Sequence, residues 1–215
     1  MTAKIPFIPT FTLLALAALA LPAQGQVVGP GCGELGNAYG PFDYTNPVHF
    51  RERLPVVERV HFDAGVEALR GHADPPQALG GDIDYTLRAF PNHHRALYAM
   101  SRYYQTQSKF NRAPLRYTAR CYFERAMRWK PDDGVVRMIY GLHLYKAGKI
   151  DDAAVRFQEA LERSPNDAEV HYNLGLVLVK SKRYEEARVH AEKAYELGHP
   201  MRGLRNKLKR AGHWD

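Results

Sequence analysis

Acidic and histidine side chains cluster in one stretch of the chain, and these residue types bind metal ions or transfer protons. Asp82, Asp84, His93 and His94 all lie within residues 82–94. Neighbouring residues project about 100° apart on a helix, so His93 and His94 do not readily share a metal ion. Neither has His, Asp or Glu four residues later, the spacing that would place a second ligand on the same face. A metal-dependent or acid–base enzyme that uses Asp82, Asp84 and His93 is therefore the least favoured hypothesis.

The rest of the sequence contains no motif that would strengthen an enzymatic interpretation. GxSxG, HExxH, a phosphate-binding loop, a dinucleotide fingerprint and paired CxxC are all missing. Asp82 is more simply explained as a helix cap, and the His pair as polar residues at a helix start. We therefore predict that the protein is not an enzyme and assign it no catalytic residue, metal site or cofactor.

The elements that position these residues follow from a repeat of 34 residues, which occurs twice between residues 134 and 200. Each copy predicts two helices. In the first copy they are 135–146 and a helix that begins at 151, and in the second they are 169–180 and a helix that begins at 184. Small and aromatic residues three or four apart place one face of each second helix against the first. The matching positions are Tyr140-Gly141, Ala153, Phe157 and Ala160 in one copy, and Leu174-Gly175, Ala187, Ala191 and Ala194 in the other.

The repeat resembles the tetratricopeptide repeat family in its period, its small residues and the closing prolines Pro131 and Pro165. The resemblance implies an all-α fold, a short right-handed solenoid of antiparallel helix pairs with an irregular N-terminal segment and a C-terminal capping helix. The segment RAFPNHH resembles MRWKPDD and LERSPND, which indicates further repeats upstream, one with six extra residues within 105–115. The predicted division begins with a signal peptide (1–25), an irregular segment (26–46) and a degenerate repeat (47–91). A repeat with an insertion (92–133), two repeats (134–167, 168–200) and a capping helix (201–215) follow. Asp82 is the predicted cap of the second helix in the degenerate repeat.

The N-terminal residues have the composition of a signal peptide. Lys4 precedes an apolar run, 11–21, that is shorter than the roughly 20 residues of a membrane-spanning helix, and small residues surround Gly25. We expect cleavage near Gly25 and a periplasmic or secreted protein; an uncleaved anchor is the alternative. Within 27–131, CGxLGxxYGPFDY and GGDIDYTLRAFPNHHRAL resemble segments of exported bacterial repeat proteins without an assigned function.

Cys32 and Cys121 are the two cysteines of the chain. An even number of cysteines in an exported protein favours a disulfide, and Cys32 lies in a Gly-rich segment that would be stabilised by one. Two buried free thiols are the alternative. The net charge of +7 is moderate, and export makes nucleic acid an unsuitable partner.

Stacked helix pairs form a concave face from their first helices, and residues one turn apart on each helix point into it. We therefore predict a groove for a protein or peptide partner. Its residues would be Arg95, Tyr98, Arg102, Met138, Leu142, Tyr145, Tyr172, Leu176 and Lys180. The alternative is that segment 27–46 covers the middle of this groove, at Leu142 and Leu176.

The last predicted helix, 201–210, has a strongly cationic outer face. The face consists of Arg202, Arg205, Lys207, Lys209 and Arg210. A polar outer surface is typical of a helix that closes a repeat array. The alternative function is binding of a polyanion or an anionic envelope surface. The sequence does not identify the partner or the oligomeric state.

Overall fold

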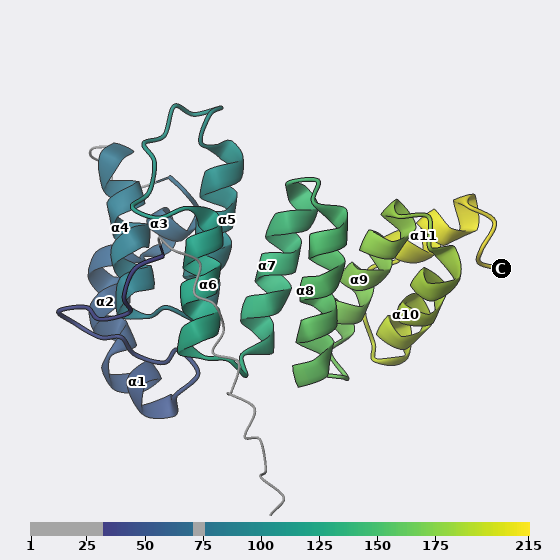
Figure 1. Ribbon diagram of the computed structural model, residues 1–215, viewed down its shortest axis with the longest axis horizontal. Coiled ribbons are helices and arrows are strands. Elements are labelled where there is room, and N and C mark those ends of the chain that lie inside the picture. Colours follow the sequence, from purple (N-terminus) through teal and green to yellow (C-terminus); the bar gives the residue numbers. More distant parts are fainter. Residues whose placement is uncertain (1–31, 71–75) are drawn as a thin grey trace, which may run out of the picture.

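A computed structural model of the chain describes residues 32–70 and 76–215 (Figure 1). The predicted signal peptide, its cleavage site and residues 26–31 lie outside this part of the chain. Within the described residues the fold is all-α, and no helix combines the length and apolar character that crossing a membrane requires. The helices are α1 (Pro47–Glu52), α2 (Leu54–His61), α3 (Ala64–Glu67), α4 (Pro76–Ala89), α5 (His94–Thr106), α6 (Ala119–Trp129), α7 (Gly134–Lys146), α8 (Ile150–Arg163), α9 (Ala168–Lys180), α10 (Tyr184–Glu196) and α11 (Gly203–Arg210).

The helices stack as pairs in one row, from the N-terminal helices at one end to α11 at the other (Figure 1). α7 packs on α8 and α9 packs on α10, while α8 and α9 join the two pairs. The two helices of the α7–α8 pair approach closely because the first carries a glycine: a Cβ on Gly141 would lie 2.9 Å from the ring of Phe157. The short solenoid of helix pairs inferred from the repeat is therefore confirmed.

Several helix starts in the array are fixed by side chains that accept backbone hydrogen bonds. Asp133 and Asp167 do so before α7 and α9, and Thr118 before α6. His93 has the same role at α5, where its Nδ1 accepts from the backbone N–H of Ala96 at 3.1 Å. The interpretation of His93 as a polar residue at a helix start is therefore confirmed.

The N-terminal helices depart from the regular pattern. The repeat pattern predicts one first helix within residues 55–70, but two short helices, α2 and α3, lie in its place, and α1 precedes them. A turn at Leu69 with φ of 60° follows α3. Asp82 does not cap its helix, because α4 begins at Pro76 and Asp82 lies inside it. The predicted cap was placed too late because Gly80 and Gly81 are typical of a loop, whereas α4 runs through both glycines and already buries Leu79.

The irregular segment 32–46 lies along second helices of the array rather than in the groove. The backbone N–H of Phe42 donates to the carbonyl oxygen of Ala89 in α4 at 2.8 Å, and Nε1 of Trp129 in α6 donates to that of Phe42 at 3.1 Å. Leu142 and Leu176 instead pack against the main core. The alternative that this segment covers both residues is wrong for its described part.

The sulfur atoms of Cys32 and Cys121 are 2.10 Å apart, a disulfide bond that ties segment 32–46 to α6. The guanidinium of Arg125, 1% exposed, lies beside it and donates from one nitrogen to the carbonyl oxygens of Cys32 (3.1 Å) and Glu34 (2.5 Å). The pairing predicted from two cysteines is therefore present, and the neighbouring backbone is held by a buried cation.

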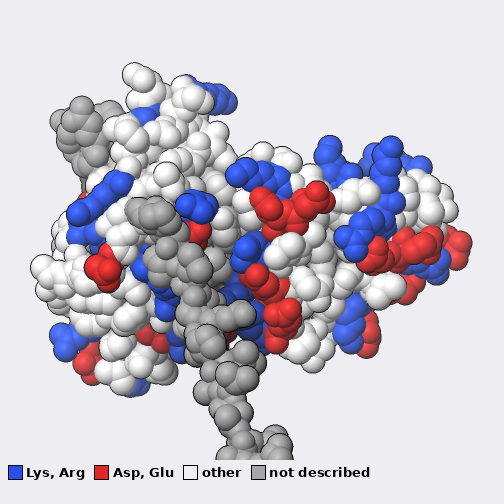
Figure 2. Space-filling model, viewed as in Figure 1, with Lys and Arg blue, Asp and Glu red and all other residues white. Residues whose placement is uncertain are grey.

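α11 closes the far end of the array. Leu204 and Leu208 are fully buried against α9 and α10, while the predicted basic face is exposed. Figure 2 shows Lys and Arg side chains gathered over the end where α11 lies. The cap predicted for residues 201–215 thus has an apolar inner side and a cationic outer side.

Candidate partner-binding groove

The side chains considered for catalysis make separate structural contacts. Nδ1 of His61 lies 2.8 Å from the carboxylate of Asp82, and Asp84 accepts from Tyr122 Oη at 2.6 Å and from Arg88 Nε at 2.9 Å. Burial lowers the pKa of His93, which lies 3.0 Å from Glu58. Each of these groups makes a different contact between elements.

One group of three potential metal ligands occurs in residues 32–70 and 76–215: Cys32, Cys121 and Glu124. The two sulfur atoms are bonded to each other and therefore offer no pair of thiolates. The carboxylate of Glu124 lies 3.1 Å from the sulfur of Cys32. The geometry is that of a structural crosslink.

The predicted groove residues on α5 differ in what they already bind. Arg95 is held by two carboxylates: its Nε donates to Glu67 at 2.9 Å, Nη2 also binds Glu67, and Nη1 lies 3.0 Å from Glu58. These contacts raise the pKa of Arg95 and lower that of Glu67. Arg95 therefore joins α5 to α2 and α3, whereas Tyr98 is 40% exposed and Arg102 is half-buried.

On α7, the predicted residues form the apolar middle of the groove. Met138, Leu142 and Tyr145 are half-buried and pack on the main core with their inner atoms. Leu176 on α9 has the same environment, and Lys180 at the end of α9 is exposed. The half-buried side chains on α7 and α9 therefore remain partly exposed to solvent.

Tyr172 is placed differently from the other predicted groove residues. It is 5% exposed and its ring stacks on His199 with a centroid distance of 4.0 Å. A Cβ on Gly203 would lie only 2.7 Å from the hydroxyl of Tyr172, so the ring packs tightly against this glycine. Tyr172 therefore packs under the start of α11 and is not available to a partner while α11 stays docked.

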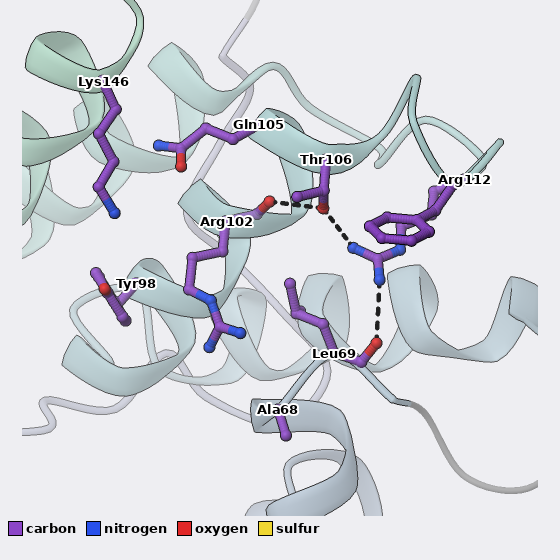
Figure 3. Close-up of a pocket in the computed structure, with 9 residues that line it drawn as sticks. Ala68, Leu69, Tyr98, Arg102, Gln105, Thr106, Arg112 and Lys146 are labelled. Carbon is purple, nitrogen blue, oxygen red and sulfur yellow. Dashed lines mark hydrogen bonds between the residues drawn. The ribbon is translucent and has the colours of Figure 1, made fainter.

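A pocket at the α5 end of the groove includes residues that periodicity did not identify. The cavity, about 660 Å³, lies between the turn after α3, the face of α5, the loop between α5 and α6, and the end of α7 (Figure 3). Its lining residues are Ala68, Leu69, Tyr98, Arg102, Gln105, Thr106, Phe110, Arg112 and Lys146. Phe110 and Arg112 belong to the predicted insertion, whose path the repeat pattern does not specify.

The pocket is electropositive. Arg102 and Lys146 approach the ring of Tyr98, at 5.9 and 5.4 Å from its centroid. Arg112 donates to Thr106 Oγ1 at 2.6 Å and to the carbonyl oxygen of Leu69 at 3.1 Å (Figure 3). None of these three cations forms an ion pair with a carboxylate in the described part of the chain, although Glu67 lies close enough to Arg102 for their charges to interact. Because no acidic residue lines the pocket, the cations give its lining a net positive charge.

Residues 141–199 match the family described as tetratricopeptide repeat. None of the curated proteins matches the chain. Among solved structures, MamA AMB-1 is 23% identical, with 68% of this chain and 81% of that chain covered and a TM-score of 0.44. MamA MSR-1 is 20% identical, with 70% of this chain and 95% of that chain covered and a TM-score of 0.43.

Proposed function

We propose that this chain, a tetratricopeptide repeat protein by residues 141–199, holds a protein or peptide partner on the face formed by α5, α7 and α9. Proteins of this family act in general as interaction scaffolds rather than as enzymes. The observation that carries the proposal is that segment 32–46 packs on α4 and α6 and leaves this face open. A face of first helices that is open and partly apolar is suited to an extended segment of another chain.

The residue types on this face fit a protein interface. Tyr98 and Tyr145 offer rigid aromatic surface, and Met138, Leu142 and Leu176 offer adjacent apolar surface. A few such anchors usually supply most of the binding energy of an interface, with Tyr and Arg among the most frequent. We therefore place the centre of the binding surface on α5 and α7.

Site-specific photocrosslinking tests the proposal. A photoreactive amino acid at Tyr145 should capture a partner in native cells, while the same group at Val155, 51% exposed on α8, should not. With that partner in hand, Tyr98→Ala and Tyr145→Ala should each cost ~1–3 kcal/mol of binding free energy. Val189→Ala on α10 is the matched control and should bind as the wild type does. Wild-type affinity of both tyrosine variants would exclude the groove.

A second candidate function is binding of a polyanion or anionic envelope surface through the outer face of α11. Arg202, Arg205, Lys207, Lys209 and Arg210 are exposed, and none has a carboxylate within ion-pair distance among the described residues. Replacing the last four with Gln should abolish salt-sensitive retention on an anionic matrix without lowering the melting temperature. Unchanged retention would leave capping as the role of this helix.

We also propose that the protein acts outside the cytoplasm, after cleavage near Gly25. The apolar run 11–21 and the Cys32–Cys121 disulfide support this location, because disulfides persist in oxidising compartments. N-terminal sequencing of protein from the cell envelope or medium should give a start near Gln26. Recovery of exported protein that still begins with Met1 would contradict cleavage.

A further inference from the structure

We infer that the pocket beside Tyr98 binds acidic side chains of the partner segment, so that the insertion between α5 and α6 selects an acidic peptide. This inference rests on the proposed function, because it places part of the same partner at one end of the groove. It adds what the repeat fold alone does not specify, namely the chemistry of the ligand.

The shape of the pocket depends on the insertion. The loop folds back over α5 because Arg112 reaches the carbonyl oxygen of Leu69, 43 positions earlier in the chain. The guanidinium of Arg112 also lies 5.3 Å from the ring centroid of Tyr103 and 4.9 Å from that of Phe110. These contacts hold Arg112 in place before any ligand arrives, which reduces the entropy lost on binding.

The charge of the pocket is left for a ligand. Arg112 and Arg102 donate to uncharged oxygen atoms, Arg102 by a long contact of 3.4 Å to the carbonyl oxygen of Glu67. The carboxylate of Glu67 is turned to Arg95, which binds both of its oxygens. Three cations therefore surround a cavity with no acidic lining residue, and a carboxylate entering it would gain charge-assisted hydrogen bonds.

The apolar part of the lining identifies the kind of molecule that carries the carboxylate. Ala68, Leu69 and Tyr98 line the cavity (Figure 3), and so does Phe110, which is 56% exposed. Tyr98 belongs both to this pocket and to the open face of α5. A peptide lying along the groove can therefore place an acidic side chain between the cations and a neighbouring apolar side chain on Leu69 or Phe110.

Three synthetic peptides test this chemistry by isothermal titration calorimetry on the full chain. The first is Gly-Leu-Glu-Glu-Leu-Gly with both ends blocked, the second has Gln in place of Glu, and the third is the Gln peptide with a free C-terminal carboxylate. The blocked Glu peptide should bind at least ~10-fold more tightly than the blocked Gln peptide, and less tightly as salt is raised from ~50 to ~300 mM. Equal binding of the two blocked peptides, no binding of either up to ~1 mM, or binding of the third peptide only, would overturn the inference.

Variants locate the binding. Arg102→Gln and Lys146→Gln should each weaken binding of the Glu peptide about 5- to 10-fold. Arg120→Gln, which removes an exposed cation on α6 outside the groove, is the matched control and should leave binding unchanged, with melting temperatures equal in all three variants. If Arg102→Gln and Lys146→Gln bind as the wild type does, the pocket is not the site.

The failure of this inference can be told apart from failure of the proposed function. Tyr145 lies on the groove but does not line the pocket. If Tyr145→Ala loses the crosslinked partner while the peptides bind equally, the groove stands and the acidic selectivity falls. If the Glu peptide depends on Arg102 and Lys146 but Tyr98→Ala and Tyr145→Ala both bind the partner with wild-type affinity, the pocket stands and the groove falls.

Discussion

The Nδ1 atoms of His171 and His190 lie 2.9 Å apart, so one imidazole donates to the other between α9 and α10. Nε2 of His171 lies 2.9 Å from the carbonyl oxygen of Pro165, which can only accept, so this nitrogen carries a proton. In neutral His171 the remaining Nδ1 is the acceptor, and His190 donates. Only one proton fits between the two Nδ1 atoms, so a second proton, taken up at low pH, would break this hydrogen bond.

The first prediction is that stability falls on acidification, in part through His190. Burial, and next the charge of His171, lower the pKa of His190. Glu186 and Arg183 also face His190 and have smaller effects: Glu186 raises this pKa and Arg183 lowers it. The unfolded state therefore binds a proton first as pH falls. Stability present above pH ~6.5 is lost as pH falls from there through the folded pKa. Urea unfolding of the wild type at pH 8 and pH 5.5 should show this loss.

His190→Gln separates this contribution from those of other histidines. Burial also lowers the pKa of His93 and His143, so the variant should keep part of the pH dependence but show a smaller loss than the wild type. At pH 8 it should be less stable by ~0.5–1.5 kcal/mol, the value of one hydrogen bond. An unchanged pH dependence would mean that His190 does not titrate in this range.

The second prediction concerns the close approach of α7 and α8. Gly141→Ala places a methyl group against the ring of Phe157 and should lower the free energy of unfolding by ~1–3 kcal/mol. Gly81→Ala is the matched control, because no atom lies within 4 Å of the added Cβ on the exposed side of α4; it should stabilise by ~0.5–1 kcal/mol. Chemical unfolding checks both, and equal effects would refute a role for helix spacing.

The third prediction concerns the buried cation beneath segment 32–46. Arg125→Met removes the hydrogen bonds to the carbonyl oxygens of Cys32 and Glu34 and should cost ~1.5–3 kcal/mol. Arg120→Met on the same helix removes only an exposed ion pair with Glu124 and should cost ~0–1 kcal/mol. Urea unfolding provides the comparison, and limited proteolysis should cut segment 32–46 sooner in Arg125→Met. A ranking in which Arg120→Met is the more damaging would contradict the structure.

The fourth prediction is that reduction destabilises the protein. The disulfide closes a loop with a sequence separation of 89, and its loss should lower the free energy of unfolding by ~2–5 kcal/mol. A double Cys32→Ala, Cys121→Ala variant should match the reduced wild type and should not respond to reductant. Two alkylatable thiols in unreduced exported protein would show that the bond does not form.

The sequence allowed the repeated part of the fold to be predicted because its contacts are local. Gly141 and Gly175 are 34 residues apart, and α7 and α9 begin 34 residues apart, at Gly134 and Ala168. Side chains spaced by three or four residues report such packing directly. Where a segment continues this spacing, as in α8 and α10, its inner face follows from periodicity alone.

Apart from the disulfide, contacts between residues far apart in the chain do not follow from repeat spacing. Tyr172 has the register of a groove residue, but its exposure depends on where α11 turns after Pro200. The pocket beside Tyr98 depends on the contact between Arg112 and Leu69, which no repeat spacing encodes. Of the missed residues, Arg112 offered a cue, as a cation two residues after aromatic Phe110 in an insertion that interrupts the period.

The disulfide divides the chain into two parts that differ in their response to a pulling force. Residues between Cys32 and Cys121 form a closed covalent loop, whereas α7 to α11 lie outside it. Tension applied between residue 32 and the C-terminus can extend the outer helix pairs, but it cannot extend the loop. The disulfide therefore shortens the fully extended length of the chain by about 290–320 Å at ~3.3–3.6 Å per residue. The α5 end of the groove, with Tyr98 and Arg102, therefore belongs to the inextensible part of the chain. The parts of the groove on α7 and α9 can unfold under the same tension.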